Sequence, residues 1–244
     1  MNLSLILSII FTILLFGTVQ SVYAHGLGSV ESDIQFFNDN FYKVKIQTNP
    51  DVLHGDESEI GFKISTINHD KVIIVSDIEY FVDIINPETN ESILSFNAYS
   101  PNESFNAKII PKNQKDISGD KRTDDFWIGT TQKPLKIDAP LFMQGGLVQV
   151  DVKILSIESE SLPRPPVFET LLTIGEYIPF EIKSDKKYDL TFATYFDKID
   201  KFHYDENNQL LTADMPFNWD IDFIKKIPYV HAEYYIPKSM KAFH

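Results

Sequence analysis

Apolar and polar residues alternate along much of the chain, beginning near residue 41. In FYKVKIQTNP (41–50), SEIGFKISTIN (58–68) and LVQVDVKILSIE (147–158), every second residue is apolar over several positions. Successive side chains of a β-strand point to opposite faces of its sheet, so this pattern predicts strands with one buried face. The residues predicted to face the core are Tyr42, Val44, Ile46, Ile60, Phe62, Ile64, Val148, Val150, Val152 and Ile154.

Turn-forming residues separate these segments from other strand-like ones. Pro-Glu-Thr-Asn at 87–90 and the pair Gly145-Gly146 are typical of tight turns, hairpins or bulges. Further strands are predicted at 72–86 (as one strand or two), 92–100, 104–111 and 135–142, with a polar lead-in at 25–40 and an exposed loop at 112–126. Short strands separated by turns are typical of an immunoglobulin-like sandwich, which we predict over 41–160.

A proline-rich segment, Pro163-Arg164-Pro165-Pro166, follows this region. Proline has no backbone N–H and favours extended backbone, so 161–166 is predicted to be a linker between two domains. Beyond the linker, strands are predicted at 167–174, 177–183, 187–196, 198–205, 209–215 and 229–237.

One helix is predicted, from Trp219 to Lys226. Asn218 precedes it as the N-cap, and Pro228 follows its end. The predicted fold is all-β, with two immunoglobulin-like β-sandwich domains, the second covering 167–244, and one short helix near the C-terminus.

The N-terminus has the pattern of a secretory signal peptide. Residues 3–20 are apolar and uncharged, and Val22 and Ala24 occupy the small-residue positions before a cleavage site. Cleavage of the signal peptide 1–24 would make His25 the first residue of a secreted or cell-surface protein. Since Met1-Asn2 carries no positive charge, a retained N-terminal anchor is the alternative. No second apolar run of spanning length follows, so we expect no membrane span after cleavage.

Composition narrows the function classes. The net charge is −13, which argues against nucleic acid as a partner, and the chain contains no cysteine, which excludes disulfides and thiol chemistry. The sequence also lacks G-x-S-x-G, H-E-x-x-H, a P-loop and G-x-G-x-x-G, so no familiar enzyme motif is present. An enzyme, such as a copper oxygenase, is the least favoured class.

A histidine at a mature N-terminus has specific chemistry. His25 would offer its α-amino group and an imidazole nitrogen to one metal ion, and nitrogen ligands in a planar arrangement select Cu(II). His231 and Glu233 stand two apart on a predicted strand and so point to one face, which makes them candidate second and third ligands. The alternative for His231 is a structural histidine near a sheet edge. The remaining histidines are His54, His69, His203 and His244.

Several blocks of the sequence also carry a resemblance to a known group of proteins. They are AHGLG at 24–28, APLFMQGGLVQVDVKILSIES at 139–159, PRPPVFE at 163–169, TFATYFDKIDKFHYD at 191–205 and ADMPFNWDIDFIKKIPYVHAEYYIPKSMKAF at 213–243. Together they resemble a family of secreted or surface β-rich proteins encoded by ammonia-oxidising archaea.

Members of that family have a mature N-terminal His-Gly-Leu-Gly, which His25–Gly28 matches. They also have a Val-His-Glu-Glu motif, which Val230–Glu233 matches except at Ala232. The resemblance implies an extracellular location and a β-rich architecture, and it implies no particular activity.

The sequence therefore predicts a secreted cell-envelope protein that binds extracellular copper, for storage, delivery or assembly. The predicted ligands are His25, His231 and Glu233. The alternative is a metal-free interaction or structural module at the cell surface, with other cell-envelope proteins as partners.

Overall fold

The structure is a computed structural model that describes residues 28–53, 59–123, 125–183, 187–194, 201–205, 207–208, 210–214 and 232–235. All the regular secondary structure in these residues is β, which confirms the all-β prediction. The described segments contain no helix long and apolar enough to cross a membrane. The predicted signal peptide and the predicted helix at 219–226 lie outside the described residues.

One sheet has eight strands. Five of its neighbouring pairs run in the order β1-β3-β5-β9-β13-β10, while β2 also pairs with β3 and β6 with β5. All the pairs are antiparallel except β9 with β13, which are parallel. The strands are β1 (Ser29–Glu31), β2 (Gln35–Phe37), β3 (Asn40–Asn49), β5 (Ile60–Asn68), β6 (Ile73–Val75), β9 (Phe105–Pro111), β10 (Asp116–Ser118) and β13 (Leu135–Ala139).

The other large sheet has ten strands, in the order β11-β12-β8-β7-β14-β16-β17-β20, with β15 beside β14 and β4 beside β16. Its strands are β4 (Val52–Leu53), β7 (Ile78–Ile85), β8 (Ser92–Ser100), β11 (Lys121–Thr123), β12 (Phe126–Ile128), β14 (Gly146–Ile157), β15 (Glu160–Ser161), β16 (Val167–Lys183), β17 (Lys187–Thr194) and β20 (Ala232–Tyr235). A separate hairpin is formed by β18 (Lys201–Asp205) and β19 (Leu210–Asp214).

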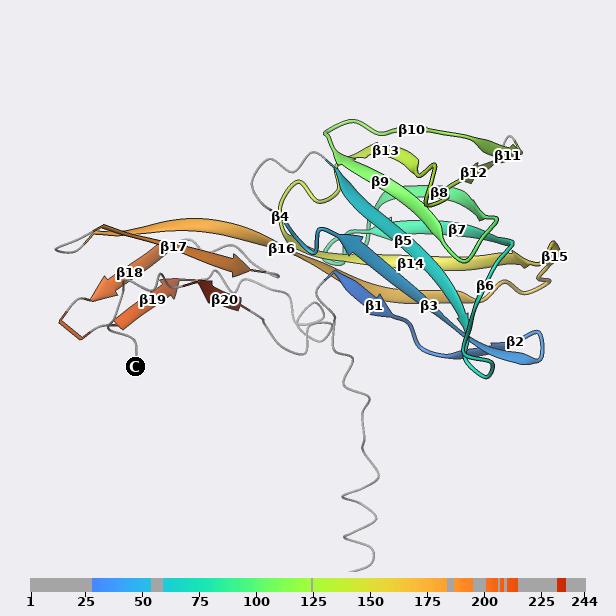
Figure 1. Cartoon of the computed structure of the whole chain (residues 1–244), viewed down its shortest axis with the longest axis horizontal. Helices are drawn as coiled ribbons and strands as arrows, with labels where there is room; N and C mark the ends of the chain where they lie inside the picture. Colours follow the sequence, from blue (N-terminus) through green and yellow to red (C-terminus); the bar gives the residue numbers. More distant parts are fainter. Residues whose placement is uncertain are drawn as a thin grey trace, which may run out of the picture.

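The two large sheets pack face to face and enclose one hydrophobic core (Figure 1). Every residue predicted above to face the core is buried, because the strands have the alternation that the sequence pattern indicates. The core also contains a polar contact between the sheets: the hydroxyls of Thr66 on β5 and Tyr80 on β7 lie 3.0 Å apart, and both residues are fully buried. Burial raises the pKa of Tyr80, so its hydroxyl stays protonated and can serve as a hydrogen-bond donor.

The 17-residue strand β16 extends beyond the sandwich. Its first part pairs with β14, from Val167 opposite Lys153 to Ile174 opposite Gly146. Its second part pairs with β17 from Glu176 onward, and Figure 1 shows the two strands reaching out from the sandwich as an arm. The segment 161–166 therefore connects strands of one sheet, and 167–174 belongs to that sheet, which differs from the domain boundary expected at this segment.

The hairpin β18–β19 packs on the arm. Phe202 lies against Phe180 of β16, with 4.2 Å between ring centroids, and against Phe192 of β17, at 5.4 Å. Tyr204 and Leu211 contact the buried Leu190. The hairpin thus gives the arm a second, small hydrophobic core. Between its two strands the hairpin turns at Asn207 and Asn208, whose backbone N–H groups donate to the Asp205 carboxylate.

Two stretches expected to be irregular contain short strands. The lead-in at 25–40 includes β1 and β2, and the exposed loop at 112–126 includes β10, β11 and the start of β12. The side chains at 113–123 are mostly exposed, as predicted. These strands are three residues long and are held by backbone hydrogen bonds, so they are too short to show an apolar periodicity.

The contact between Thr66 and Tyr80 makes a testable contribution to stability. Tyr80→Phe should lower the free energy of unfolding by about 1–2 kcal/mol, because it leaves the buried Thr66 hydroxyl without its partner. Thr66→Val should cost a similar amount, and the double variant should cost clearly less than the sum. Urea denaturation of the four proteins measures this. Additive costs, to within about 0.3 kcal/mol, would show that the two hydroxyls contribute independently.

Candidate metal centre and a pocket at the base of the arm

The described chain begins at Gly28, three residues after His25, and Gly28 is fixed to two strands. Its N–H donates to the carbonyl of Thr173 on β16 at 3.0 Å, and its carbonyl accepts from the N–H of Thr48 on β3 at 2.7 Å. Its φ is +61°, and a Cβ at this position would lie 2.3 Å from the Cβ of Asp51. Glycine is therefore required here, and the chain that leads back to His25 starts from a fixed point.

Glu233 is the one predicted metal ligand inside the described residues, since His25 and His231 lie outside them. It stands on β20 opposite Ala193 of β17, and its side chain is partly buried. Its Oε2 accepts a hydrogen bond from the Tyr235 hydroxyl at 2.5 Å, and that hydroxyl accepts one from the Tyr177 hydroxyl at 3.2 Å. Because Tyr235 donates to a carboxylate, the pKa of its phenol lies above the ordinary value.

Among the described residues, no three histidine or acidic side chains lie close enough together to hold a metal ion. His69 and His203 are both exposed, as expected for surface imidazoles. His54 and His244 lie outside the described residues. The structure therefore leaves the predicted ligand set as the one to test, with Glu233 as its described member.

The described residues nearest to His25 and His231 in the sequence are Gly28 and Ala232. Both can be placed relative to residues 173–176 of β16, Gly28 by direct contact and Ala232 through β17. Gly28 bonds to Thr173, while Ala232, the neighbour of His231, pairs with Thr194, which pairs with Glu176. Gly28 and Ala232, the two anchors, lie on opposite sides of β16. Gly28 and β4 share one edge of this strand, and because Glu176 pairs with both β4 and β17, β17 must lie on the other edge. Across the strands, the path from Gly28 to β16, β17 and β20 has three spacings of about 4.8 Å. Along the strands, Thr173 and Glu176 are three residues of about 3.3 Å apart, so Gly28 and Ala232 are separated by roughly 17 Å.

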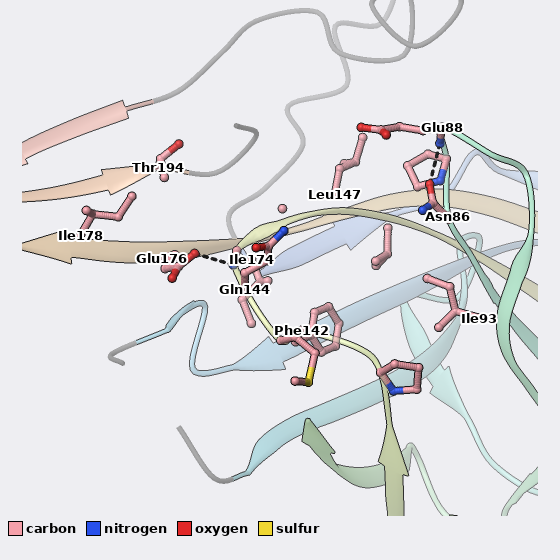
Figure 2. Close-up of a pocket in the computed structure, with 16 residues that line it drawn as sticks. Asn86, Glu88, Ile93, Phe142, Gln144, Leu147, Ile174, Glu176, Ile178 and Thr194 are labelled. Carbon is pink, nitrogen blue, oxygen red and sulfur yellow. Dashed lines mark hydrogen bonds between the residues drawn. The ribbon is translucent and has the colours of Figure 1, made fainter. Parts of the chain in front are cut away.

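A pocket of about 450 Å³ lies at the base of the arm (Figure 2). Its walls come from the turn after β7, the loop between β13 and β14, and the strands β14, β16 and β17. The lining residues are Asn86, Pro87, Glu88, Ile93, Pro140, Phe142, Met143, Gln144, Gly145, Gly146, Leu147, Val148, Ile174, Glu176, Ile178 and Thr194.

The pocket follows from the alternation of side chains between the two faces of β16. On one face of this strand, Phe168, Leu172 and Ile174 belong to the sandwich core, and Phe180 belongs to the small core of the arm. Glu176 and Ile178 lie between them on the same face and line the pocket. The pocket is thus the gap between the two cores. Tyr177, on the opposite face of β16, belongs to the chain of hydroxyls that leads to Glu233.

The loop between β13 and β14 closes one side of the pocket and is held to β16. The N–H of Gly145 donates to Oε2 of Glu176 at 3.1 Å, and a Cβ on Gly145 would lie 2.8 Å from the Cβ of Glu176. Phe142 is buried with a φ of +56°, a region that few non-glycine residues adopt. The loop is therefore fixed against the strand by a close approach that only glycine permits.

The chain matches no family model, and no curated protein or solved structure matches it.

The sequence predicts Glu233 as a ligand and a turn or bulge at Gly145-Gly146, but it does not predict the pocket. The apolar pattern of 167–183 is interrupted at Gly175 and Glu176, so two strands were predicted where the structure has one continuous strand. The two residues that interrupted the pattern are where β16 passes from one core to the next. The carboxylate of Glu176, within an otherwise apolar stretch, is the sequence feature that could have indicated the pocket.

The hydrogen bond between Tyr235 and Glu233 predicts a pH effect. Glu233→Gln removes the negative charge that holds the phenol proton, so the pKa of Tyr235 should fall towards about 10. Titration of tyrosine ¹³Cζ signals by NMR, with Tyr235→Phe to assign the signal, measures this. Glu169→Gln on β16 serves as the matched control and should leave the titration unchanged. An unaltered Tyr235 pKa in Glu233→Gln would mean that the two side chains do not interact in solution.

Proposed function

We propose that this is a secreted cell-envelope protein that binds extracellular Cu(II) through a mature N-terminal His25, with His231 and Glu233 as further ligands. The role would be copper storage, delivery or assembly. The observation that carries the proposal is the position of Gly28 beside Thr173 of β16 and of Ala232 two strands further on, in register with Glu176 through Thr194. Two segments more than two hundred residues apart in the sequence thus start roughly 17 Å from each other.

The lengths of the two segments suit this role. The three residues from Gly28 to His25 span at most about 11 Å, and His231 is one peptide, about 3.8 Å, from Ala232. Together they cover most of the roughly 17 Å between the anchors, and the two imidazole side chains add to that reach. The covalent geometry thus allows both histidines to meet one ion.

The chemistry of the ligand set also suits Cu(II). An α-amine and two imidazoles supply neutral nitrogens, which this ion prefers to the oxygen ligands of harder cations. Glu233 accepts a hydrogen bond from Tyr235, and a hydrogen bond to a ligating carboxylate is a common way to orient it. Since the nitrogens must be deprotonated, binding should weaken as the pH falls below the imidazole and amine pKa values, about 6.5 and 8.

The finer features of the predicted fold belong to the same proposal. An immunoglobulin-like arrangement over 41–160 is supported by two sheets packed around one core, and a second β-rich unit by the separate small core of the arm. In this arrangement the sandwich fixes Gly28, and the arm carries the strand that leads to His231.

Electron paramagnetic resonance tests the copper proposal. Protein that begins at His25 should bind one equivalent of Cu(II) with nitrogen hyperfine structure. Protein with one extra N-terminal residue should bind at least about 100-fold more weakly, since it loses the amine of His25 as a ligand. His231→Ala should remove a nitrogen from the spectrum. Gly28→Ala should also weaken binding by displacing the anchor, while Ser29→Ala should not.

Equal and weak copper binding by the proteins with and without the extra residue would overturn the proposal. If the N-terminal residue matters but His231→Ala leaves the spectrum unchanged, His25 would bind copper without the far end of the chain, and the intramolecular site would be wrong.

The metal-free alternative has one specific observation in its favour. The end of the sandwich away from the arm exposes large apolar side chains around β2 and β6 (Figure 1). They are Ile34, Phe36, Phe41, Val72, Ile73 and Ile74. Phe36 and Phe41 pair across β2 and β3 with ring centroids 4.9 Å apart. An exposed group of this kind is typical of protein interaction sites.

If the protein acts as an interaction module, Phe36→Ser with Phe41→Ser should reduce its co-sedimentation with cell envelopes by about tenfold. Substitution of two exposed residues should leave the unfolding transition nearly unchanged. Undiminished co-sedimentation would remove this surface as the attachment site.

A further inference from the structure

The pocket at the base of the arm has a one-sided charge. Two of its lining residues, Glu88 and Glu176, carry carboxylates, and among the described residues the lining contains no lysine, arginine or histidine. The pocket therefore has a formal charge of −2 within a protein whose net charge is −13. An anionic ligand would meet repulsion here, and a cationic ligand would be attracted.

Part of the remaining lining is apolar. Ile93, Phe142, Leu147, Ile174 and Ile178 present hydrocarbon, beside the polar side chains of Asn86, Gln144 and Thr194 (Figure 2). A hydrated metal ion would gain nothing from such walls. The surface favours a ligand with an apolar body, because burial of hydrocarbon contributes about 25 cal/mol per Å².

The carboxylate of Glu176 and the backbone of Glu88 are held in place. Glu176 accepts from the N–H of Gly145 through one carboxylate oxygen, which leaves the other for a ligand. Glu88 belongs to a turn in which Oδ1 of Asn86 accepts from the N–H groups of Glu88 at 2.9 Å and of Thr89 at 3.3 Å. Groups that are fixed before binding lose little entropy when a ligand arrives.

We propose that this pocket binds an organic cation, an ammonium or guanidinium group on an apolar stem, with its charge at Glu176. Such a group is found on free amines and on lysine or arginine side chains of a partner protein. The pocket lies on the opposite face of β16 from Tyr177 and the hydroxyl chain to Glu233. The proposal therefore does not rest on the copper ligands.

Methyl NMR of the mature, metal-free protein tests the proposal with phenethylamine as the probe. The methyl signals of Leu147, Ile174 and Ile178 should shift and saturate. Glu176→Gln keeps an acceptor for the Gly145 N–H while removing the charge, so it should weaken binding about tenfold. Glu169→Gln removes the same charge from an exposed position on the same strand, outside the lining, and should leave binding unchanged.

2-Phenylethanol is the matched uncharged probe and should bind at least about tenfold more weakly than phenethylamine. Equal binding of the two probes, equal effects of Glu176→Gln and Glu169→Gln, or shifts confined to methyl groups outside the pocket would each overturn the proposal.

A second pair of probes distinguishes the sources of the cation. Acetyl-phenylalanyl-arginine amide is compared with the same dipeptide carrying citrulline, which has the shape of arginine without its charge. Binding of the arginine peptide that exceeds that of phenethylamine points to a basic side chain of a partner protein. Preference for phenethylamine points to a free amine. If neither cation shifts the pocket methyl signals, the proposal is wrong.

Discussion

The backbone hydrogen bonding of β16 is the constraint on which the rest of the structure depends. Buried N–H and C=O groups need partners, and a strand of 17 residues presents them along two edges. On one edge β14 serves the first half and β17 the second, and on the other edge Gly28 and β4 meet residues 173–176. The sandwich, the arm and the chain leading back to His25 are joined through this one strand.

The alternation of side chains along β16 then separates the two candidate sites. One face runs from the sandwich core, past Glu176 and Ile178, to Phe180 in the arm, and it lines an acidic pocket whose walls are partly apolar. The other face carries Tyr177, which leads through Tyr235 to Glu233. One face of β16 contributes Ile174 to the core of the sandwich and Phe180 to the core of the arm. Glu176 lies on that face between the two cores.

Glycine at two positions makes these connections possible. Gly28 takes a positive φ and lies against Asp51, at the edge of β16. Gly145 lies against Glu176, which brings the loop before β14 into the wall of the pocket. A side chain at either position would collide with its neighbour, so the same small residue fixes the approach to both candidate sites.

The sequence by itself determined the all-β class and the buried faces of β3, β5 and β14, because period-2 alternation is a local property that each strand carries. It also singled out His25, His231 and Glu233 from residue chemistry. Only the tertiary structure decided that 167–183 is one strand, since the pairing that carries it past Gly175 and Glu176 comes from β4, β14 and β17. The pocket and the positions of Gly28 and Ala232 relative to β16 were also decided by the tertiary structure. They depend on which distant strands become neighbours, and that is set by backbone pairing and core packing, which leave no local pattern in the sequence.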